Sequence, residues 1–341
     1  MGRIERKKLI EQIETRRKSR LIVYMTGDRR GLETKIATDV YPFFMDHLSR
    51  IGERERIDLF LYSTGGDTIA GYALVNMIRE FCSKFGVIIP FKALSCATLI
   101  TLGADDVIMT KMSQLGPIDP SVVSPLGPYA PAPGPPGATQ IVPISVEDVI
   151  SYLDLARKEM PLKDEDSLVR IFDRLSQNVN PLALGAVNRV REQIRFLSKE
   201  LLKRHMSDQD RINHIVDVLI KLRFSHNYVI GRTEARDVLR LNIADQDGDF
   251  EKLVLDLYRE YDKLLKLSVP YHPESVLGKE GKDSKVASAT FKRAVIESTE
   301  KCHVFETVRE VTRVTVMPPQ VPQPVQGYME RIISEEWVER D

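Results

Sequence analysis

Two short segments of this sequence combine residue types that could carry out acyl transfer. The first, Thr64–Asp67, contains the pair Gly65-Gly66, and the second begins at Ser95 and continues with Cys96. Glycine leaves backbone N–H groups open to a cavity, where two of them can stabilise an oxyanion. A serine hydroxyl beside such a pair is a candidate nucleophile. Each segment alone is a weak signal, because Gly-Gly turns and helix-capping serines are usually structural.

The elements around these segments predict that the two come together. Apolar runs predict strands, and 3.6-residue periodicity between them predicts helices. The strands are expected at 20–27, 57–63, 87–93 and 106–110, and the helices at 33–51, 68–81 and 95–103. Single helices between strands imply right-handed crossovers and a mainly parallel sheet. Successive strand-to-helix junctions of such a sheet open on the same edge, so we expect the Gly65-Gly66 turn beside Ser95.

The rest of the chain divides by composition. We expect a charged leader at 1–19, a catalytic core at 20–122, a Pro/Gly-rich loop at 123–143, a helical part at 144–270 that completes the catalytic domain, and a C-terminal β-hairpin tail at 271–341. The loop is either a surface connection or a lid beside the site. Helices are predicted at 145–159, 165–177, 181–205, 207–222 and 248–266. A Pro-rich stretch and a short C-terminal helix are expected after the hairpin.

Composition excludes several classes of function. The 49 basic and 49 acidic side chains cancel, so no global field favours nucleic acid or an anionic membrane. The three cysteines are too widely spaced for a disulfide framework or a metal site. No apolar run has the length of a membrane span, and the N-terminus has no secretory h-region. We expect a cytoplasmic protein without a metal or other cofactor.

Three segments in order resemble the serine dehydrogenase proteinase family. They are Tyr62–Asp67, Ser95–Asp105 and Leu115–Pro120. That family is related to the signal peptide peptidases and the Clp protease. The similarity continues through 180–187 and 224–236. The resemblance implies an α/β, Clp/crotonase-like fold and a serine peptidase, or a related amide or ester hydrolase. It also implies a peptide or protein substrate and a homo-oligomer.

The resemblance also implies a catalytic triad in the chain order Ser, Asp, His. Ser95 falls on the nucleophile, Asp119 on the acid and His226 on the base. The N–H groups of Gly66 (or Gly65) and Cys96 would then form the oxyanion hole. No histidine lies between residues 48 and 204, so the histidine that the Clp protease carries shortly after its serine is absent here.

Alternatives remain open. The signal peptide peptidases pair serine with lysine, and here Lys158 or Lys163 would be that base, provided that burial lowered its pKa. The Cys96 thiol is disfavoured as nucleophile because buried free cysteines are usually inert. The fold could also serve as a catalytically degenerate scaffold that binds a peptide strand. Crotonase-like acyl-CoA chemistry would not need Ser95.

Overall fold

The computed structural model describes residues 2–118, 121–122, 125–132, 138–142, 144–159, 165–221, 228–278, 286–316 and 325–340. The chain forms two compact units, one of residues 1–115 with 230–341 and one of residues 116–229. The expected leader at 1–19 and tail at 271–341 both belong to the first unit, together with the parallel strands.

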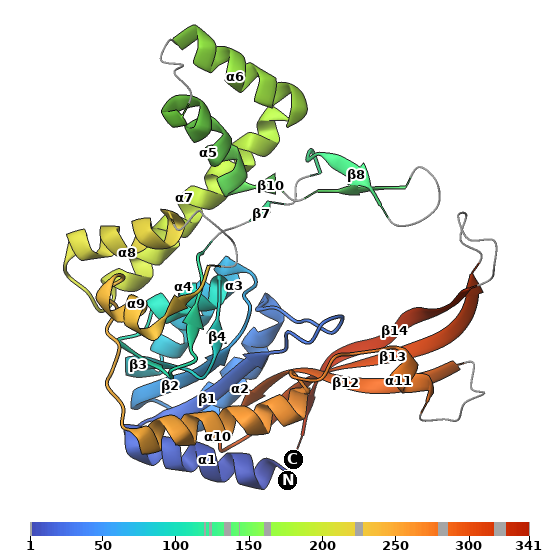
Figure 1. The fold of residues 1–341 in the computed structure, drawn as a ribbon. Coiled ribbons are helices and arrows are strands. Elements are labelled where there is room, and N and C mark those ends of the chain that lie inside the picture. The colour runs from blue at the N-terminus through green and yellow to red at the C-terminus, as the bar shows by residue number, and fades with distance from the viewer. Residues whose placement is uncertain are drawn as a thin grey trace. The chain divides into compact units, whose positions relative to one another are not determined.

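One large sheet organises the first unit (Figure 1). Among the described residues it has seven strands in the order β14-β13-β12-β1-β2-β3-β5. Their bounds are β1 Arg20–Thr26, β2 Arg54–Tyr62, β3 Cys82–Ile89, β5 Asp106–Met109, β12 Val286–Glu297, β13 Cys302–Val316 and β14 Val325–Glu339. The strands β1, β2, β3 and β5 are parallel, which confirms the predicted sheet.

The C-terminal strands extend this sheet rather than forming a separate hairpin. Strand β12 pairs antiparallel with β1, β13 with β12, and β14 with β13. The prediction of a short C-terminal helix is wrong, because residues 325–339 form the strand β14. Pairing with β13 along almost its whole length satisfies the backbone groups on one side of β14, and this long-range partner outweighs local helix propensity.

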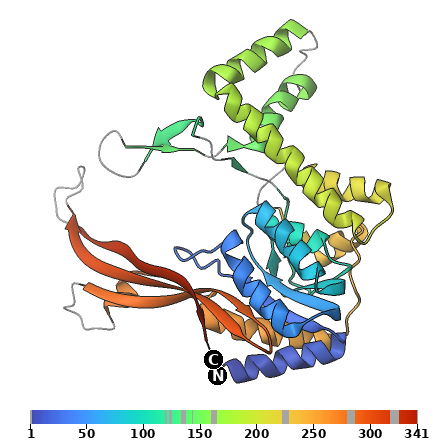
Figure 2. The same ribbon diagram turned by 180° about the vertical axis from the view of Figure 1, so that it is seen from behind.

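Helices cover both faces of the parallel strands. Leu21, Val23 and Met25 of β1 are fully buried in a core that α1 (Arg3–Arg17) and α10 (Gly248–Leu265) share. Tyr24 points to the opposite face and packs edge-on against Phe44 of α2 (Tyr41–Ile51), with ring centroids 5.3 Å apart. Helix α3 (Thr68–Arg79) lies on the same side as α2 (Figure 2). Burial on both faces explains why these strands are continuously apolar.

The predicted helix at 33–51 begins later than expected. A 3-10 turn, η1 (Thr38–Val40), leads into α2 at Tyr41. Ile36 is instead extended and forms a parallel bridge with Gly66. This pairing withdraws the backbone of Ile36 from any helix, and it is a contact that helical periodicity does not reveal.

A small sheet carries the chain from β3 to the helix that follows Ser95. It consists of β4 (Lys92–Ala93), β6 (Gln114–Leu115) and β11 (Ile230–Gly231). Ser63 forms a parallel bridge with Ala93, with Ser63 N–H to Lys92 O at 2.9 Å and Leu94 N–H to Ser63 O at 3.0 Å. Helix α4 (Cys96–Leu102) follows at once. The end of β2 and the start of α4 are therefore tied together.

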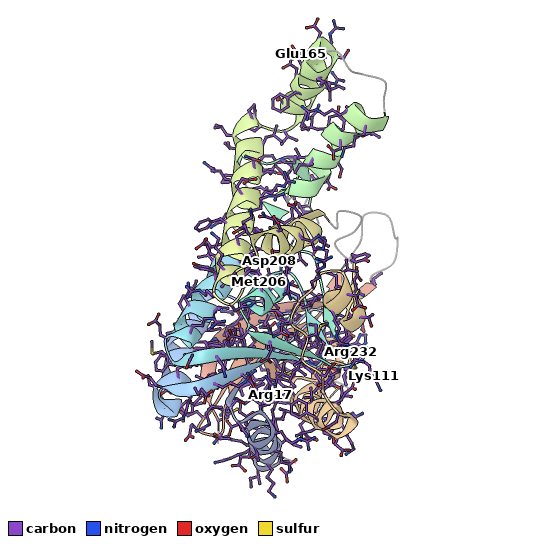
Figure 3. The ribbon with its side chains drawn as sticks, turned by 90° about the vertical axis from the view of Figure 1, so that its left-hand side faces the viewer. Arg17, Lys111, Glu165, Met206, Asp208 and Arg232 are labelled. Atoms are coloured by element: carbon purple, nitrogen blue, oxygen red, sulfur yellow. The ribbon has the colours of Figure 1, made fainter. Side chains whose placement is uncertain are left out.

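Buried ion pairs fix the opposite edge of the sheet, where the parallel strands begin. Arg17, labelled in Figure 3, contacts Asp58 at 2.9 Å and Asp106 at 2.6 Å. Arg56 bonds the same two carboxylates, at 2.9 and 2.7 Å. Asp58 is fully buried. Asp58 accepts from both arginines and from Ser19 Oγ at 2.9 Å, so several donors compensate its buried charge.

The second unit is mainly helical. Its helices are α5 (Val146–Asp154), the π-helical turn η2 (Leu155–Glu159), α6 (Glu165–Asn178), α7 (Pro181–Lys203) and α8 (Gln209–Lys221). In Figure 3, Glu165 marks the start of α6, and Met206 and Asp208 mark the turn from α7 to α8. These bounds, and those of α10, confirm the helices predicted from periodicity.

The unit also holds short strands. β7 (Ser121–Val122) pairs with β10 (Ile144–Ser145), and β8 (Tyr129–Pro131) pairs with β9 (Thr139–Ile141). Part of the Pro/Gly-rich segment is thus a hairpin rather than irregular chain. Two further short helices, α9 (Arg232–Asp237) and α11 (Glu274–Leu277), belong to the first unit. None of the helices in the described ranges combines the length and the apolar character that a membrane crossing requires.

Candidate active site

Ser95 stands at a sharp, strained turn between strand β4 and helix α4. Its backbone has φ 53° and ψ −115°, and it is the residue that precedes the first turn of α4. Non-glycine residues rarely adopt such angles, and holding one there costs about 1–3 kcal/mol. Strand-to-helix turns of this kind display the nucleophilic serine of α/β-hydrolases. The surrounding structure therefore holds Ser95 in a conformation that it would not adopt by itself.

The Gly65-Gly66 turn lies directly against Ser95. A Cβ built on Gly65 would be 2.9 Å from Ser95 Cβ and 3.2 Å from Ser95 Oγ. Gly65 has φ 118°, a conformation that side chains rarely adopt. The structure thus brings together the two segments that the sequence singled out, and a glycine is required at the point of contact.

Gly66 is held by the bridge to Ile36. Ile36 N–H donates to Gly65 O at 2.9 Å, and Asp67 N–H donates to Ile36 O at 2.8 Å. A Cβ on Gly66 would lie 2.1 Å from Ile36 O, so a side chain at position 66 would collide with the backbone of Ile36. The two hydrogen bonds of this bridge are made by Gly65 O and Asp67 N–H, the neighbours of Gly66 in the chain. Within the described residues, the N–H of Gly66 itself has no hydrogen-bond partner.

A second free donor comes from the start of α4. Cys96 is the first residue of the helix, so its N–H has no partner within the helix. Elsewhere in the described chain it finds none either, and the same holds for the Ser95 hydroxyl. By contrast, the N–H of Gly65 donates to Ser63 Oγ at 3.0 Å. Of the two glycines, Gly66 is the one with a free N–H.

The Cys96 thiol is packed between α3 and α4. Its Sγ donates to Asp67 O at 3.0 Å, and the side chain is fully buried. Burial raises the pKa of the thiol to about 12. A Cβ on Gly71 of α3 would be 2.5 Å from this sulfur, so the thiol fills the close contact between α3 and α4. A thiol that stays protonated and packed is a poor nucleophile, as the sequence analysis expects.

The expected acid and base, Asp119 and His226, lie outside the described residues, as does Lys163. Lys158 lies in η2, where its side chain is 66% exposed and pairs with Asp154 at 2.8 Å. Lys92, three residues before Ser95, pairs with Asp28 at 2.7 Å. Lys158 and Lys92 are therefore already paired with carboxylates.

Sequence reasoning missed the residues that support the turn from below, Ser63 and Thr26. Thr26 Oγ1 donates to Ser63 Oγ at 2.7 Å, and Ser63 Oγ donates to Gly65 O at 3.2 Å. Both hydroxyls are buried. A serine two residues before a glycine is a local sign of a side-chain-to-backbone turn, whereas Thr26 comes from another strand and leaves no such sign.

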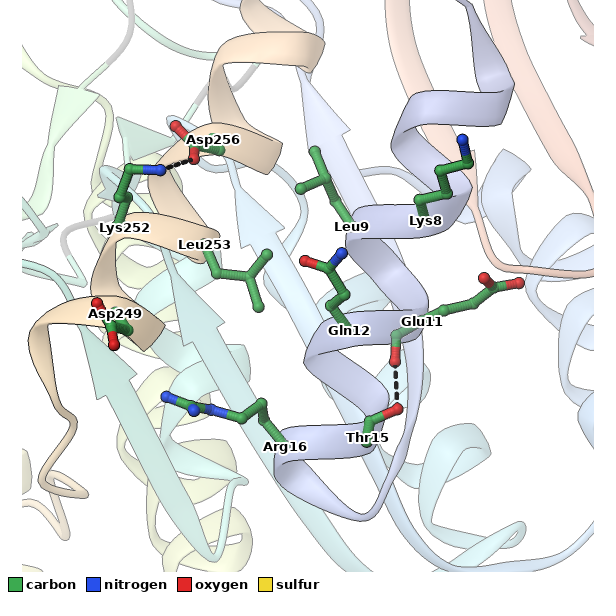
Figure 4. Close-up of a pocket in the computed structure, with 10 residues that line it drawn as sticks. All are labelled: Lys8, Leu9, Glu11, Gln12, Thr15, Arg16, Asp249, Lys252, Leu253 and Asp256. Atoms are coloured by element: carbon green, nitrogen blue, oxygen red, sulfur yellow. Dashed lines mark hydrogen bonds and ion pairs between the residues drawn. The ribbon is translucent and has the colours of Figure 1, made fainter.

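An open groove of about 600 Å³ lies elsewhere, between α1 and α10 (Figure 4). It is lined mainly by charged and polar side chains, such as Lys8, Arg16 and Asp249, and Lys252 pairs with Asp256 on its wall at 3.1 Å. None of its lining residues belongs to the group around Ser95. The groove is therefore separate from the candidate active site.

Comparison with protein families bears on the same region. Residues 2–132 match the model of the ClpP-like SDH-type serine proteinases, which confirms the resemblance over this part of the chain. These residues include Gly65, Gly66, Ser95 and Cys96. They also include every parallel strand of the large sheet.

Two uncharacterized proteins of Methanocaldococcus jannaschii are similar in sequence. MJ1495 is 30% identical over 127 residues, which are 35% of this chain and 43% of that protein. MJ0137 is 25% identical over 204 residues, 60% of this chain and 59% of that protein. The match therefore spans less than two thirds of the length of either relative.

Three solved structures are similar at low identity. The membrane-bound stomatin-specific protease 1510-N, as a mutant, has 14% identity and a TM-score of 0.37, with 63% of this chain and 77% of that chain covered. ClpP1 from Listeria monocytogenes has 15% identity and a TM-score of 0.35, with 71% and 97% covered. The ClpP catalytic domain from Plasmodium falciparum has 12% identity and a TM-score of 0.35, with 73% and 93% covered.

Proposed function

We propose that this protein is a serine peptidase whose nucleophile is Ser95. The observation that carries the proposal is the strained backbone of Ser95 in contact with Gly65, together with two N–H groups, those of Gly66 and Cys96, that have no partner in the described chain. A hydroxyl beside two free backbone donors is the minimal arrangement for acyl transfer. The family match over residues 2–132 supports the same chemistry.

In the proposed mechanism, Ser95 Oγ attacks the carbonyl carbon of the substrate. His226 takes the hydroxyl proton and later gives it to the leaving amine, while Asp119 orients the imidazole. The N–H groups of Gly66 and Cys96 stabilise the oxyanion of the tetrahedral intermediate. Water then attacks the acyl-enzyme, with the same histidine as base, and releases Ser95.

Lysine is the less favoured base in this proposal. A lysine base must be buried and free of a carboxylate partner. Lys158 is largely exposed and ion-paired with Asp154, and Lys92 is ion-paired with Asp28. A Ser95/Lys158 dyad is the alternative mechanism, and a pH–rate profile distinguishes it from the triad.

The proposed substrate is a peptide or protein, and the proposed state is a cytoplasmic homo-oligomer. The formal net charge of zero supports the expectation that nucleic acid is not a partner. Light scattering of the purified protein at micromolar concentration tests the assembly, and a monomer would contradict it. A scaffold that binds peptides without cleaving them is the competing function.

A fluorophosphonate probe separates the peptidase from the scaffold. The probe phosphonylates an activated serine, so we expect labelling of the wild type and none of Ser95→Ala. Ser49→Ala, an exposed serine of α2, is the matched control and should label as the wild type does. Absence of labelling in a folded wild type would favour the scaffold, and labelling of Ser95→Ala would place the nucleophile elsewhere.

A further inference from the structure

We propose that Ser63 is a positioning residue that aims the oxyanion-hole N–H of Gly66. The proposal rests on the function proposed above and adds a residue that acts through the Gly65–Gly66 peptide. Ser63 lies between the end of β2 and the Gly65-Gly66 turn, and its side chain is fully buried.

The hydrogen bonds of the Ser63 hydroxyl are complete. Its oxygen accepts from Thr26 Oγ1 at 2.7 Å and from Gly65 N–H at 3.0 Å, and its hydrogen is donated to Gly65 O at 3.2 Å. A hydroxyl has one donor and two acceptor sites, so all three are used. The hydroxyl thus holds both polar groups of Gly65.

The carbonyl of Gly65 determines where the N–H of Gly66 points. The two belong to one planar, trans peptide group, in which the N–H is directed opposite to the C=O. The carbonyl receives two donors, Ile36 N–H at 2.9 Å and the Ser63 hydroxyl at 3.2 Å. Both lie on the side away from the Gly66 N–H. Fixing the carbonyl therefore fixes the N–H in the direction where it has no protein partner.

Glycine makes this clamp necessary. Gly65 and Gly66 have φ of 118° and 155°, and glycine peptides reorient more readily than others because no Cβ restricts them. An oxyanion hole acts by being in position before charge develops. Without the Ser63 hydroxyl, the carbonyl of the Gly65–Gly66 peptide would keep one of its two donors, Ile36 N–H, and the N–H of Gly65 would lose its acceptor.

The test is the rate at which a fluorophosphonate probe labels Ser95 in the full chain. Because the oxyanion hole acts on the transition state, Ser63→Ala should lower the limiting rate kinact about 10- to 100-fold and leave the probe's half-saturation concentration unchanged. Ser63→Cys keeps the size of the side chain but donates weakly, and should fall between wild type and Ser63→Ala. Ser298→Ala is the matched control.

Ser298 is likewise buried, and its hydroxyl bonds His47 Nδ1 at 2.8 Å, far along the sheet beside β12. Its loss should lower the melting temperature without changing kinact. If Ser63→Ala fails to fold, Ser63→Cys decides. Wild-type kinact in a folded Ser63 variant, or an equal loss in Ser298→Ala, would overturn the positioning role. A wild type that is not labelled would instead contradict the proposed function itself.

Discussion

A methyl group at position 65 would lie 2.9 Å from Ser95 Cβ, closer than such carbon atoms approach in proteins. The contact between Ser95 and the turn beside it therefore requires glycine at position 65. This contact results from the bridge between Ser63 and Ala93. The bridge joins the end of β2 to β4, the strand that leads into α4.

Gly65→Ala should reduce activity about a hundredfold while the protein stays folded. The added methyl must displace Ser95, and small misplacements of a reacting group cost about that much in rate. Gly65→Ala is a better probe than a substitution of Gly66, where a Cβ would meet Ile36 O at 2.1 Å and disrupt the backbone bridge. Probe labelling and peptide cleavage measure the loss.

Gly248→Ala is the control for this variant. Gly248 begins α10, and a Cβ there would have nothing within 4 Å. Activity should equal that of the wild type. Unchanged turnover in Gly65→Ala would show that Ser95 does not depend on the contact with residue 65.

Ser95→Gly should be inactive but more stable than Ser95→Ala. Alanine retains the strain of φ 53° and ψ −115°, whereas glycine adopts these angles freely. After the entropic cost of glycine, we expect a difference of about 1–2 kcal/mol in the free energy of unfolding, measured by urea denaturation.

At Ser49 the glycine variant should be less stable than the alanine variant, the opposite order to that at Ser95. Ser49 is exposed inside α2, where glycine is less stable than alanine by about 0.5–1 kcal/mol. Equal stability of Ser95→Gly and Ser95→Ala would mean that the turn at Ser95 stores no strain.

The identity of the base is decided by a pH–rate profile. With His226 as base, kcat/KM should rise with an apparent pKa of about 6–7. His226→Ala should fall to the residual rate of Ser95→Ala, because triad members act as a unit. Asp119→Asn should lose nearly as much, through the wrong imidazole tautomer.

Lys158→Ala serves as the comparison and should keep full activity. Inactive Lys158→Ala together with active His226→Ala would replace the triad by the Ser/Lys dyad. The rising limb of the profile would then follow the amine instead of an imidazole.

Acid should destabilise the fold through His47. Its ring is fully buried, with Nδ1 2.8 Å from Ser298 Oγ and Nε2 3.1 Å from His303 Nδ1. Burial, and next the neighbouring His303, lower the pKa of His47 to about 4. Asp46 opposes this shift, whereas Lys301 and Arg3 add to it. Burial lowers the pKa of His303 as well.

The sign follows from proton binding. Between pH 6.5 and about 4 the unfolded chain binds a proton that the folded His47 excludes, so stability falls as the pH falls through this window. For His47 alone the loss is on the order of 3 kcal/mol at pH 4. Urea denaturation at several pH values measures it.

His47→Asn should be less stable at neutral pH but lose less between pH 6.5 and 4. His272→Asn changes an exposed histidine and should retain the wild-type slope. Parallel stability curves for His47→Asn and wild type would show that other groups dominate the acid response.

The sequence by itself determined the parallel core and the neighbourhood of the two candidate segments. Continuous apolar strands separated by single helices allow few topologies, and in a parallel sheet the ends of successive strands share one edge. The sequence therefore predicts that Gly65 and Gly66 lie beside Ser95. The helical periodicity of α6, α7 and α10 was equally local, and their bounds agree with prediction.

Only the tertiary structure decided which donors are free and what fixes them. The backbone angles of Ser95, the bridge from Ile36 to Gly66 and the hydroxyl chain from Thr26 through Ser63 all depend on pairing between separate segments. The same cause moved residues 325–339 from the expected helix to an edge strand, because β13 offered unpaired backbone groups. Local propensity is a fraction of a kcal/mol per residue, and long-range hydrogen bonds and burial outweigh it.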